Sequence, residues 1–520
     1  MGSRTPRREE DESPASPLFP LVSAQKMRML ERENESLLGK RSRKIGIIPF
    51  PPPNFGMIFA TSPPVAPFPA PPWRLIRRAF AILLFALPVC ASASQAPFLF
   101  AAVDYPEASS LSNSLDRFWV LVAAFLVFFM QAGFKAMESG LVRKPHADSV
   151  AVKNLLDWLI VCVVFYAVGF GLMFGATNEG WIGESLFFPE ADALARIAGE
   201  SSHGLGFEFF LFQLAFAGTA ATIVSGAIAE RTILSTYLLL AGLTTLLYSV
   251  LGHWSWGGLY LENQQGFLER RGFHDFAGST VVHSLGAWVA LAAVIVIRPR
   301  AGRYAADGSI QFGRFMPNSL HYSAMGVIIL WLGWFGFNGG SVLAFNDQVA
   351  PIIFKTTICG ATAGLTAFFF GWMTSAVKIN VYPKLMGGIV GGLVAATACC
   401  DVISQNQAII LGIFSGFIHN LAFDLMLRLR WDDVVGAVPI HGACGVIGTL
   451  WVAVAEPSFE KMMDTLQVQA FGVTVVFVAS FFPALLLCLF FHGTMGLRIG
   501  LQQERDGYVI GSRRDGSSVS

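Results

Sequence analysis

The feature that most constrains this chain is a succession of apolar segments, each long enough to cross a lipid bilayer. A helix needs about 20 predominantly apolar residues to span the hydrocarbon core. Backbone groups in lipid must be satisfied within the protein, and segments of this length favour helices over the strands of a barrel. The sequence therefore predicts an all-α polytopic membrane protein with eleven transmembrane helices, at about 118–139, 151–175, 207–229, 233–256, 277–297, 321–342, 350–374, 384–400, 406–426, 435–455 and 470–496.

Composition excludes a soluble protein. Charged residues make up 14% of the chain and apolar residues 54%, whereas an ordinary soluble domain is about 25% charged. The chain has 46 phenylalanines and 52 glycines, which suits helices that pack closely in lipid. A net charge of +1 provides no field that would attract nucleic acid. We expect the bilayer to be the main surrounding of this protein.

The N-terminal region differs from the rest. Residues 1–73 are charged and then proline-rich, and we expect a disordered leader there. Residues 74–93 combine arginines, an apolar run and small residues, which predicts a signal peptide cleaved after Ala93. A signal peptide normally begins a chain, so either the natural start lies downstream, for example at Met57, or the leader is a genuine extension. The remaining predicted regions are an extracytoplasmic segment (94–117), the membrane domain (118–497) and a cytoplasmic tail (498–520).

The distribution of lysine and arginine predicts the orientation. With the N-terminus outside, the inner loops and tail hold fifteen of these residues and the outer segments hold five. Positive residues concentrate on the cytoplasmic side of membrane proteins. We therefore expect a multi-pass protein of the cell inner (plasma) membrane, with its N-terminus outside and its C-terminus in the cytoplasm.

An internal repeat relates two of the segments. Segment five begins at Asp275 and reaches a histidine at His283, and segment ten shows the same spacing from Asp433 to His441. The two motifs lie five segments apart, and an odd number of segments inverts the second copy in the membrane. Inverted repeats place a transport site near the midplane, where the halves meet. The predicted architecture is a five-plus-five inverted repeat with one extra helix.

The two histidines are the first candidate functional residues. Ionisable groups inside a membrane are costly and usually face a cavity or the bundle interior. At about 1.5 Å per residue, His283 lies roughly 12 Å deeper than Asp275, and His441 lies at a similar depth from the opposite face. Two neutral imidazoles that meet there would offer a donor and an acceptor to a small polar molecule. Alternatively, each histidine only satisfies a buried partner.

Aromatic residues form the second candidate group. Phe212 and Phe216 are four residues apart and share one helix face, while Trp256, Phe337 and Ser341 lie toward the outer ends of their helices. Rings at such places are usually interfacial anchors or core. If they converge, their faces would attract a small cation with about 2 kcal/mol when desolvated. The Ser341 hydroxyl could accept a hydrogen bond from that cation.

The sequence predicts neither a metal site nor a cofactor. Its seven cysteines are scattered, without a CxxC spacing or a Cys/His cluster. An intramembrane hydrolase would need a nucleophile beside His283 or His441. Ser284 and Cys444 are adjacent, but no orienting third residue is evident. We therefore expect that the protein is not an enzyme.

Several motifs, in order along both halves, carry a specific resemblance. The motifs are Met130-Gln-Ala-Gly-Phe134, Met137-Glu-Ser-Gly-Leu-Val-Arg143, Phe212-Gln through Ala217, Ala220-Ala-Thr-Ile-Val-Ser-Gly-Ala-Ile-Ala-Glu-Arg231, Gly272-Phe-His-Asp-Phe-Ala-Gly-Ser-Thr-Val-Val-His283, Gly333-Trp-Phe-Gly-Phe-Asn-Gly-Gly-Ser341 and Gly436-Ala-Val-Pro-Ile-His-Gly-Ala-Cys-Gly445. With these motifs, over roughly residues 115–500, the chain resembles the ammonium transporter (Amt) family of the Amt/Mep/Rh superfamily.

The resemblance implies roles for these residues. Phe212, Trp256 and Ser341 would bind ammonium at the outer face, with Asp275 supporting that site without touching the ion. Phe216 and Phe337 would form a gate, and His283 with His441 a pore and proton relay. The resemblance also implies a homotrimer with one pore per subunit, nitrogen uptake as ammonium, ammonia or methylammonium, and a nitrogen-regulatory PII protein as partner at the inner face. The tail lacks the family's usual finish, which weakens the PII expectation.

The expected mechanism follows from the size of the ion. Ammonium and potassium have similar radii, but only ammonium can lose a proton at a dry constriction. A bare ion in a low dielectric costs on the order of 20 kcal/mol before relaxation, which neutral ammonia avoids. The alternative function is an ammonium sensor on the same fold. Sensors of this type carry a fused kinase or cyclase domain, so the short tail after position 496 favours transport.

Overall fold

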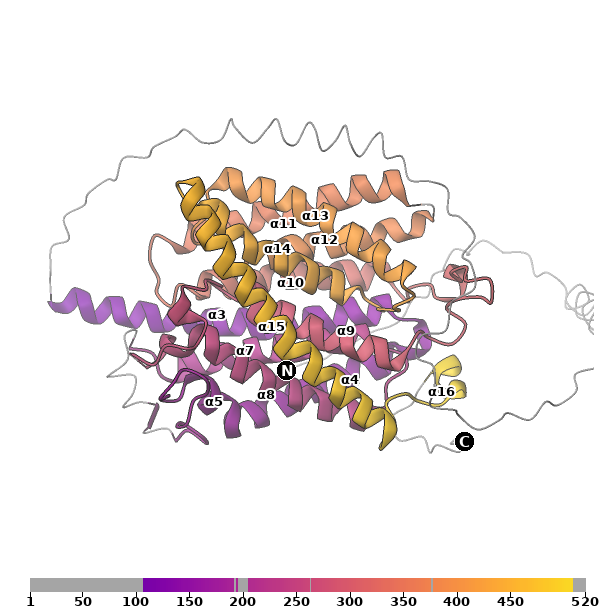
Figure 1. The fold of residues 1–520 in the computed structure, drawn as a ribbon, viewed down its shortest axis with the longest axis horizontal. Coiled ribbons are helices and arrows are strands. Elements are labelled where there is room, and N and C mark those ends of the chain that lie inside the picture. The colour runs from indigo at the N-terminus through magenta and orange to yellow at the C-terminus, as the bar shows by residue number, and fades with distance from the viewer. Residues whose placement is uncertain (1–105, 191–192, 195–203, 262, 376, 508–520) are drawn as a thin grey trace, which may run out of the picture. The chain divides into compact units, whose positions relative to one another are not determined.

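A computed structural model describes residues 106–190, 193–194, 204–261, 263–375 and 377–507 (Figure 1). The chain divides into two units, residues 1–66 and 67–520, and every described residue belongs to the second. The expected leader, the signal peptide and the last residues of the tail lie outside the described residues. The predictions for those regions therefore stay predictions.

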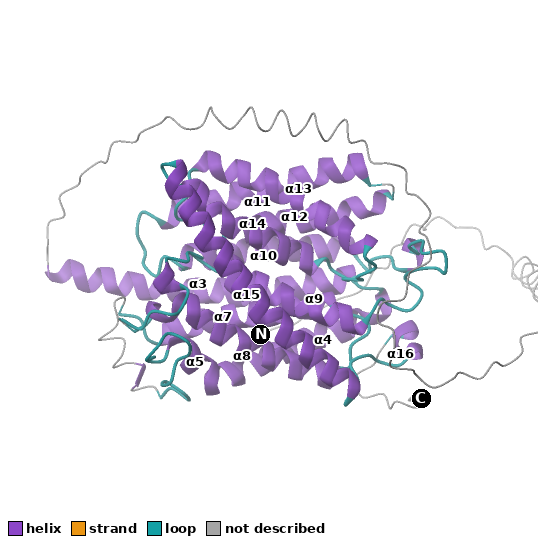
Figure 2. Cartoon of the chain, in the orientation of Figure 1, coloured by secondary structure: helices purple, strands orange, loops and turns teal. Residues whose placement is uncertain are grey.

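The described residues form helices joined by loops, without a strand (Figure 2). Eleven membrane-length apolar helices lie in these ranges, which confirms the predicted all-helical fold. They are α3 (Pro106–Leu141), α4 (Ala147–Val164) continued by η3 (Phe165–Gly169) and α5 (Phe170–Phe174), α7 (Phe207–Ala227), α8 (Leu234–Trp256), η6 (Ser279–Ser284) with α9 (Leu285–Ile297), α10 (Leu320–Gly340), α11 (Val349–Thr374), α12 (Val381–Ala396), α13 (Gln405–Arg428), η9 (Val438–Ala443) with α14 (Cys444–Trp451) and η10 (Val452–Ala455), and α15 (Phe459–Gly493).

Serine side chains cap the N-termini of three of these helices. The Ser319 and Ser458 hydroxyls accept backbone N–H bonds at the starts of α10 and α15. Ser404 accepts from the backbone of Gln407, whose side chain accepts from the backbone of Ser404 in return. Such caps satisfy N–H groups that have no partner within the helix. The start of each helix is therefore encoded locally.

The packing of the helices shows the inverted repeat. In the first half α3 contacts α4 and α7, and α7 contacts α8 and α9. The second half repeats this pattern, because α10 contacts α11 and α12, and α12 contacts α13 and α14. The halves meet where α3 packs along α10 and where η6 packs against η9. The two helices that carry the histidines therefore lie together at the centre of the repeat; we call them the broken helices, because each changes from a π-helix to an α-helix along its length.

Glycine permits the closest of these contacts. A Cβ atom on Gly326 of α10 would lie 2.5 Å from the Met137 backbone nitrogen and 2.6 Å from the Gly133 carbonyl oxygen of α3. Small residues let helix backbones approach each other in lipid, where no hydrophobic effect drives them together. The first helices of the two halves are therefore joined along their backbones.

The eleventh helix, α15, stands outside the repeat. It is 35 residues long and crosses diagonally over the other helices (Figure 1). It contacts α8, η6 and α9 of the first half and α14 and η10 of the second. After α15 the chain forms the short helix α16 (Leu501–Asp506).

We name the two ends of the bundle after the aspartates that begin the broken helices. The Asp433 end carries a buried ion cluster: Arg300 donates to Glu230 (Nη1–Oε1, 2.8 Å) and to Asp432 (Nε–Oδ2, 2.8 Å), and Arg143 donates to Glu230 (Nε–Oε2, 2.6 Å). Burial alone would raise the pKa of Glu230 and of Asp432, but the guanidinium groups hold both below their usual range. Both carboxylates are therefore charged.

The tail is part of this cluster. Glu504 of α16 is 1% exposed and pairs with Arg498 (Oε2–Nη2, 2.8 Å). Its backbone carbonyl accepts from Arg143 (Nη2–O, 2.7 Å), and one of its carboxylate oxygens accepts from the backbone of Ala301. The last described helix is therefore attached to the loop after α3 and to the connection between the two halves.

We expect Arg300→Met to destabilise the fold by about 3–5 kcal/mol, because it leaves two buried carboxylates without their shared partner. Thermal unfolding in detergent should show a clear fall in Tm. The matched control is Arg117→Met, since Arg117 pairs with Glu208 while its side chain is 55% exposed; exposed pairs contribute about 0–1 kcal/mol. Equal Tm values for the two variants would contradict a stabilising role for the cluster.

Candidate functional site

The first broken helix begins at a backbone turn that Asp275 closes. Its carboxylate accepts the backbone N–H of Gly278 (3.1 Å) at Oδ1, and those of Thr280 and Val281 (both 2.9 Å) at Oδ2. Gly278 has φ +109°, a conformation that residues with a side chain rarely adopt. The chain then continues as the π-helix η6, which carries His283.

The second broken helix repeats this geometry. Asp433 accepts the backbone N–H of Gly436 (2.9 Å) and of Val438 (2.8 Å), and Gly436 has φ +77°. The π-helix η9 follows and carries His441. The Asp-x7-His repeat is therefore a repeat of structure as well as of sequence. π-Helices are rare in proteins, and the short ones that do occur often lie at functional sites.

The two histidines meet. Their Nδ1 atoms are 3.3 Å apart, and their rings are nearly parallel, with centroids at 5.2 Å and planes 21° apart. His283 is completely buried and His441 is 4% exposed. One Nδ1 must carry the proton and the other must accept it, which leaves Nε2 of the accepting ring protonated. No described residue supplies a hydrogen-bond partner to Nε2 of His283.

A column of rings leads from the Asp275 end to this pair. Trp256 packs on Phe216 (centroids 6.3 Å apart), and Phe216 stacks on Phe337 (3.9 Å). Phe337 in turn stacks on His283 at 5.2 Å, and Phe212 lies beside Phe216 at 4.6 Å. These side chains come from four helices of both halves, and all are buried. The path to the histidines is therefore closed by two stacked phenylalanine rings.

The remaining predicted residues lie at the Asp275 end of the column. The Trp256 indole N–H donates to the backbone carbonyl of Asp275 (2.8 Å), which ties the end of α8 to the start of the broken helix. The Ser341 hydroxyl donates to the Phe337 carbonyl (2.8 Å), and a Cβ atom on Gly340 would lie 2.8 Å from the Phe212 ring. The structure thus brings together all eight residues singled out in the sequence.

Two further residues belong to the column and escaped the sequence reasoning. Trp334 stacks on His283 (5.3 Å) and is held by its own indole N–H, which donates to the Thr397 hydroxyl (2.9 Å). Phe134 packs on the other histidine, His441, at 6.2 Å. Both lie within motifs that the resemblance includes, but neither spacing nor polarity distinguishes them from ordinary core residues.

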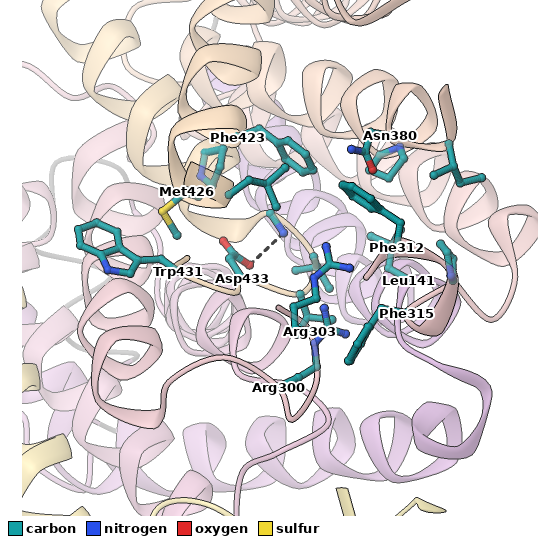
Figure 3. Close-up of a pocket in the computed structure, with 18 of the residues that line it drawn as sticks. Leu141, Arg300, Arg303, Phe312, Phe315, Asn380, Phe423, Met426, Trp431 and Asp433 are labelled. Atoms are coloured by element: carbon teal, nitrogen blue, oxygen red, sulfur yellow. Dashed lines mark hydrogen bonds between the residues drawn. The ribbon is translucent and has the colours of Figure 1, made fainter. Parts of the chain in front are cut away.

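A cavity opens at the Asp433 end. Its empty space, with the open solvent at its mouth included, is about 760 Å³, and it reaches Pro439 of η9, two residues from His441. Figure 3 shows Asp433 in this cavity, with Arg300 and Arg303 beside it. Aromatic side chains cover another part of its wall, among them Phe315, which lies under the guanidinium of Arg303 at 5.3 Å. The second broken helix is therefore accessible from this end.

Comparison with known families gives a match over the whole membrane domain. The model of the Ammonium Transporter Family matches residues 118–511. This chain belongs to the ammonium transporter family. Members of the family are transporters rather than enzymes, and ammonium transport is accordingly the activity of the family to which this membrane protein belongs.

Individual relatives agree. The chain is 39% identical to a putative ammonium transporter of Synechocystis over 408 residues (76% of this chain, 73% of that one). It is 40% identical to the ammonium transporter Amt2 of Archaeoglobus fulgidus over 342 residues (65% and 70%).

Among solved structures, a sensor Amt protein superposes with a TM-score of 0.73 and 38% identity, over 77% of this chain and 98% of that one. A single-residue mutant of Mep2 from Candida albicans superposes with a TM-score of 0.64 and 25% identity, over 74% and 86%.

The two turn glycines of this ammonium transporter family member give a matched test. A Cβ atom at Gly278 would lie 2.5 Å from Val282 Cγ2 and 2.9 Å from the Trp256 ring, whereas at Gly436 the nearest atom is 3.6 Å away. We expect Gly278→Ala to abolish ammonium uptake because it displaces Trp256 and η6. Gly436→Ala adds only backbone strain of about 1–2 kcal/mol and should retain uptake. Uptake by cells that lack other ammonium transporters measures this, and equal loss in both would contradict it.

Proposed function

We propose that this protein transports ammonium across the membrane by capturing it at the Asp275 end, removing a proton and passing ammonia along the histidine pair. One observation carries the proposal. A column of stacked rings ends on His283, whose Nε2 has no hydrogen-bond partner among the described residues. A buried polar atom without a partner is costly unless a ligand or water occupies the site.

Phe212, Trp256 and Ser341 bind the ammonium ion at the Asp275 end. Two aromatic faces attract a cation through their ring quadrupoles, and a hydroxyl that already donates to Phe337 still has lone pairs for an N–H donor. Asp275 acts from behind, since the residue is only 4% exposed and both of its carboxylate oxygens accept backbone N–H groups. It holds the turn and contributes negative charge, but does not touch the ion.

Selection occurs at the gate of Phe216 and Phe337. With ring centroids 3.9 Å apart, the stacked pair leaves no room for a hydrated ion, so one ring must move for anything to pass. Potassium would have to shed its hydration shell to enter, and moving the bare ion from water into a low dielectric costs on the order of 20 kcal/mol before relaxation. Ammonium can instead release a proton and enter as neutral ammonia.

The histidine pair then forms hydrogen bonds with ammonia and provides a route for the proton. Ammonia can accept from a protonated Nε2 or donate to an unprotonated one. Both rings stay neutral when the shared Nδ1 proton moves only if the donor ring gains a proton at its Nε2 and the acceptor ring loses the proton from its own Nε2. A proton that enters at one Nε2 and leaves at the other therefore exchanges both tautomers. The proton released at the Asp275 end and the ammonia leaving at the Asp433 end recombine there to ammonium.

Orientation and assembly are further parts of the proposal. Arg143, Arg300, Arg303 and Arg498 gather at the Asp433 end, which favours a cytoplasmic position for that end. The Asp275 end would then face outward, in the cell inner membrane. The family resemblance supports nitrogen uptake and a homotrimer with one pore in each subunit, while the sequence pattern of residues 74–93 supports a signal peptide that is removed. A PII protein at the cytoplasmic face would meet the cavity near Asp433.

An ammonium sensor is the second candidate. The observation that favours it is the likeness to a solved sensor Amt protein, which this chain covers over 98% of its length. A sensor would bind ammonium in the same column and convert occupancy into a signal rather than into flux. The two functions differ in turnover, which can be measured directly.

We expect ammonium jumps on liposomes adsorbed to a solid-supported membrane to produce a saturable current, and potassium jumps to produce none. Replacing both His283 and His441 with leucine should abolish the current, because the column then offers no polar group to ammonia or to the proton. Asp275→Ala should weaken it by disordering the turn.

The outcomes separate the candidates. An undiminished current in the double variant would exclude a proton role for the histidines. The absence of current in the parent protein, with ammonium still quenching tryptophan fluorescence, would favour the sensor or electroneutral passage of ammonia. A pH-sensitive dye inside the liposomes distinguishes these two, because only passage of ammonia makes the lumen alkaline.

A further inference from the structure

The segment that carries Asp275 is attached on one side to the turn after α12. Phe276 donates its backbone N–H to the Ala398 carbonyl (3.1 Å), and Ala277 donates to that of Thr397 (2.9 Å). At the far end of this contact the imidazole of His274 meets the carboxylate of Asp401, with Nε2 at 3.2 Å from Oδ1 and 3.0 Å from Oδ2. His274 is the residue immediately before Asp275 and has no part in the site described above.

On the other side, Gln469 of α15 holds the His274 backbone. Its side-chain oxygen accepts the His274 N–H (2.9 Å), and its amide donates to the His274 carbonyl and to the Thr449 carbonyl (3.1 Å). Gln469 is completely buried. The position of the His274 backbone therefore does not depend on what its imidazole binds.

The His274–Asp401 pair is open to solvent. The side chains are 37% and 22% exposed, so protons from the outer solution reach them. The other charged groups nearby are Asp275 on the same segment and Lys355 of α11, whose ammonium donates to the backbone carbonyls of Asp401 and Ile403. Gln469 of α15 adds only a neutral amide. Burial by itself would lower the pKa of His274, but Asp401, together with Asp275, outweighs it and raises the pKa above its ordinary value.

We propose that His274, paired with Asp401, makes the capture of ammonium depend on the proton concentration at the outer face. This inference rests on the proposed transport function and adds to it a positioning residue that acts through charge. Neither His274 nor Asp401 belongs to the ring column or to the histidine pair.

The direction of the change in KM follows from what protonation of His274 alters. A neutral imidazole with its proton on Nε2 can still donate to Asp401, and Gln469 holds the backbone in either state, so the geometry persists. Only the charge differs. While His274 is neutral, the Asp401 carboxylate contributes a negative charge at the outer mouth, which favours a cation. When His274 is protonated the pair is neutral and this attraction is lost, so the KM for ammonium rises as the solution becomes acidic.

The magnitude is that of a solvent-screened charge. We expect KM to rise about two- to threefold between about pH 8 and pH 5, the range in which histidine titrates. Because the His274 pKa is raised, the midpoint should lie above about 6.5, the ordinary value. The maximal current should not follow this step, since the pair lies outside the path. Ammonium itself remains protonated across this range.

The experiment measures KM and maximal current separately, from ammonium jumps on a solid-supported membrane across this pH range. His274→Gln keeps a donor for Asp401 but cannot be charged, so its KM should stay at the low value of the parent protein at all pH values. Asp401→Asn removes the carboxylate charge that stabilises the protonated imidazole, so the pH-dependent change in KM should move to a lower pH. The matched control is His492→Gln, an exposed histidine at the opposite end of α15, which should behave like the parent.

The outcomes are distinct from those for the transport function. A saturable current whose KM shows the same pH step in the parent and in His274→Gln overturns this inference and leaves transport intact. A parent KM that does not change with pH does the same. No saturable current in the parent at any pH contradicts the proposed transport function instead. A step that is absent in His274→Gln and shifted in Asp401→Asn establishes His274 as the responsible group.

Discussion

The site depends on how two carboxylates satisfy the backbone where the broken helices begin. The first N–H groups of a helix have no partner within it, and in the interior of a membrane protein no bulk water replaces that partner. Asp275 and Asp433 each accept several of these N–H groups, next to a glycine with positive φ. This arrangement allows each helix to start inside the bundle and places His283 and His441 opposite each other at its centre.

Around this centre the protein separates charge from apolar surface. The guanidinium and carboxylate groups of the ion cluster lie at the Asp433 end, whereas the column between the ends consists of rings. The attraction between charged groups in a low dielectric offsets their desolvation cost only when the groups are paired and hydrogen-bonded. The cluster meets this condition, whereas the column places two imidazoles against aromatic faces. We therefore expect a neutral small molecule to meet a much lower barrier in the column than an ion does.

Much of this could be predicted from the sequence. Eleven apolar segments, the five-plus-five repeat and membership of the ammonium transporter family are confirmed by the helices and by the comparisons. The predicted site residues do converge, although their roles stay predictions. What could not be predicted is the π-helical form of η6 and η9, since apolar periodicity does not distinguish one extra residue per turn from a regular helix. Trp334 and Phe134 escaped for a similar reason, because buried rings in a membrane segment look alike in a sequence.

The sequence by itself determined which segments cross the membrane, because length and hydropathy act locally and backbone groups in lipid leave few alternatives to a helix. It also determined the chemistry available at Asp275, Asp433 and the two histidines. Only the tertiary structure decided which groups meet: the 3.3 Å contact between the imidazoles, the stacking of Phe216 on Phe337, and the pairing of His274 with Asp401 across 127 residues. Such contacts join helices far apart in the chain, and their geometry follows from the packing of both halves together, which no local pattern records.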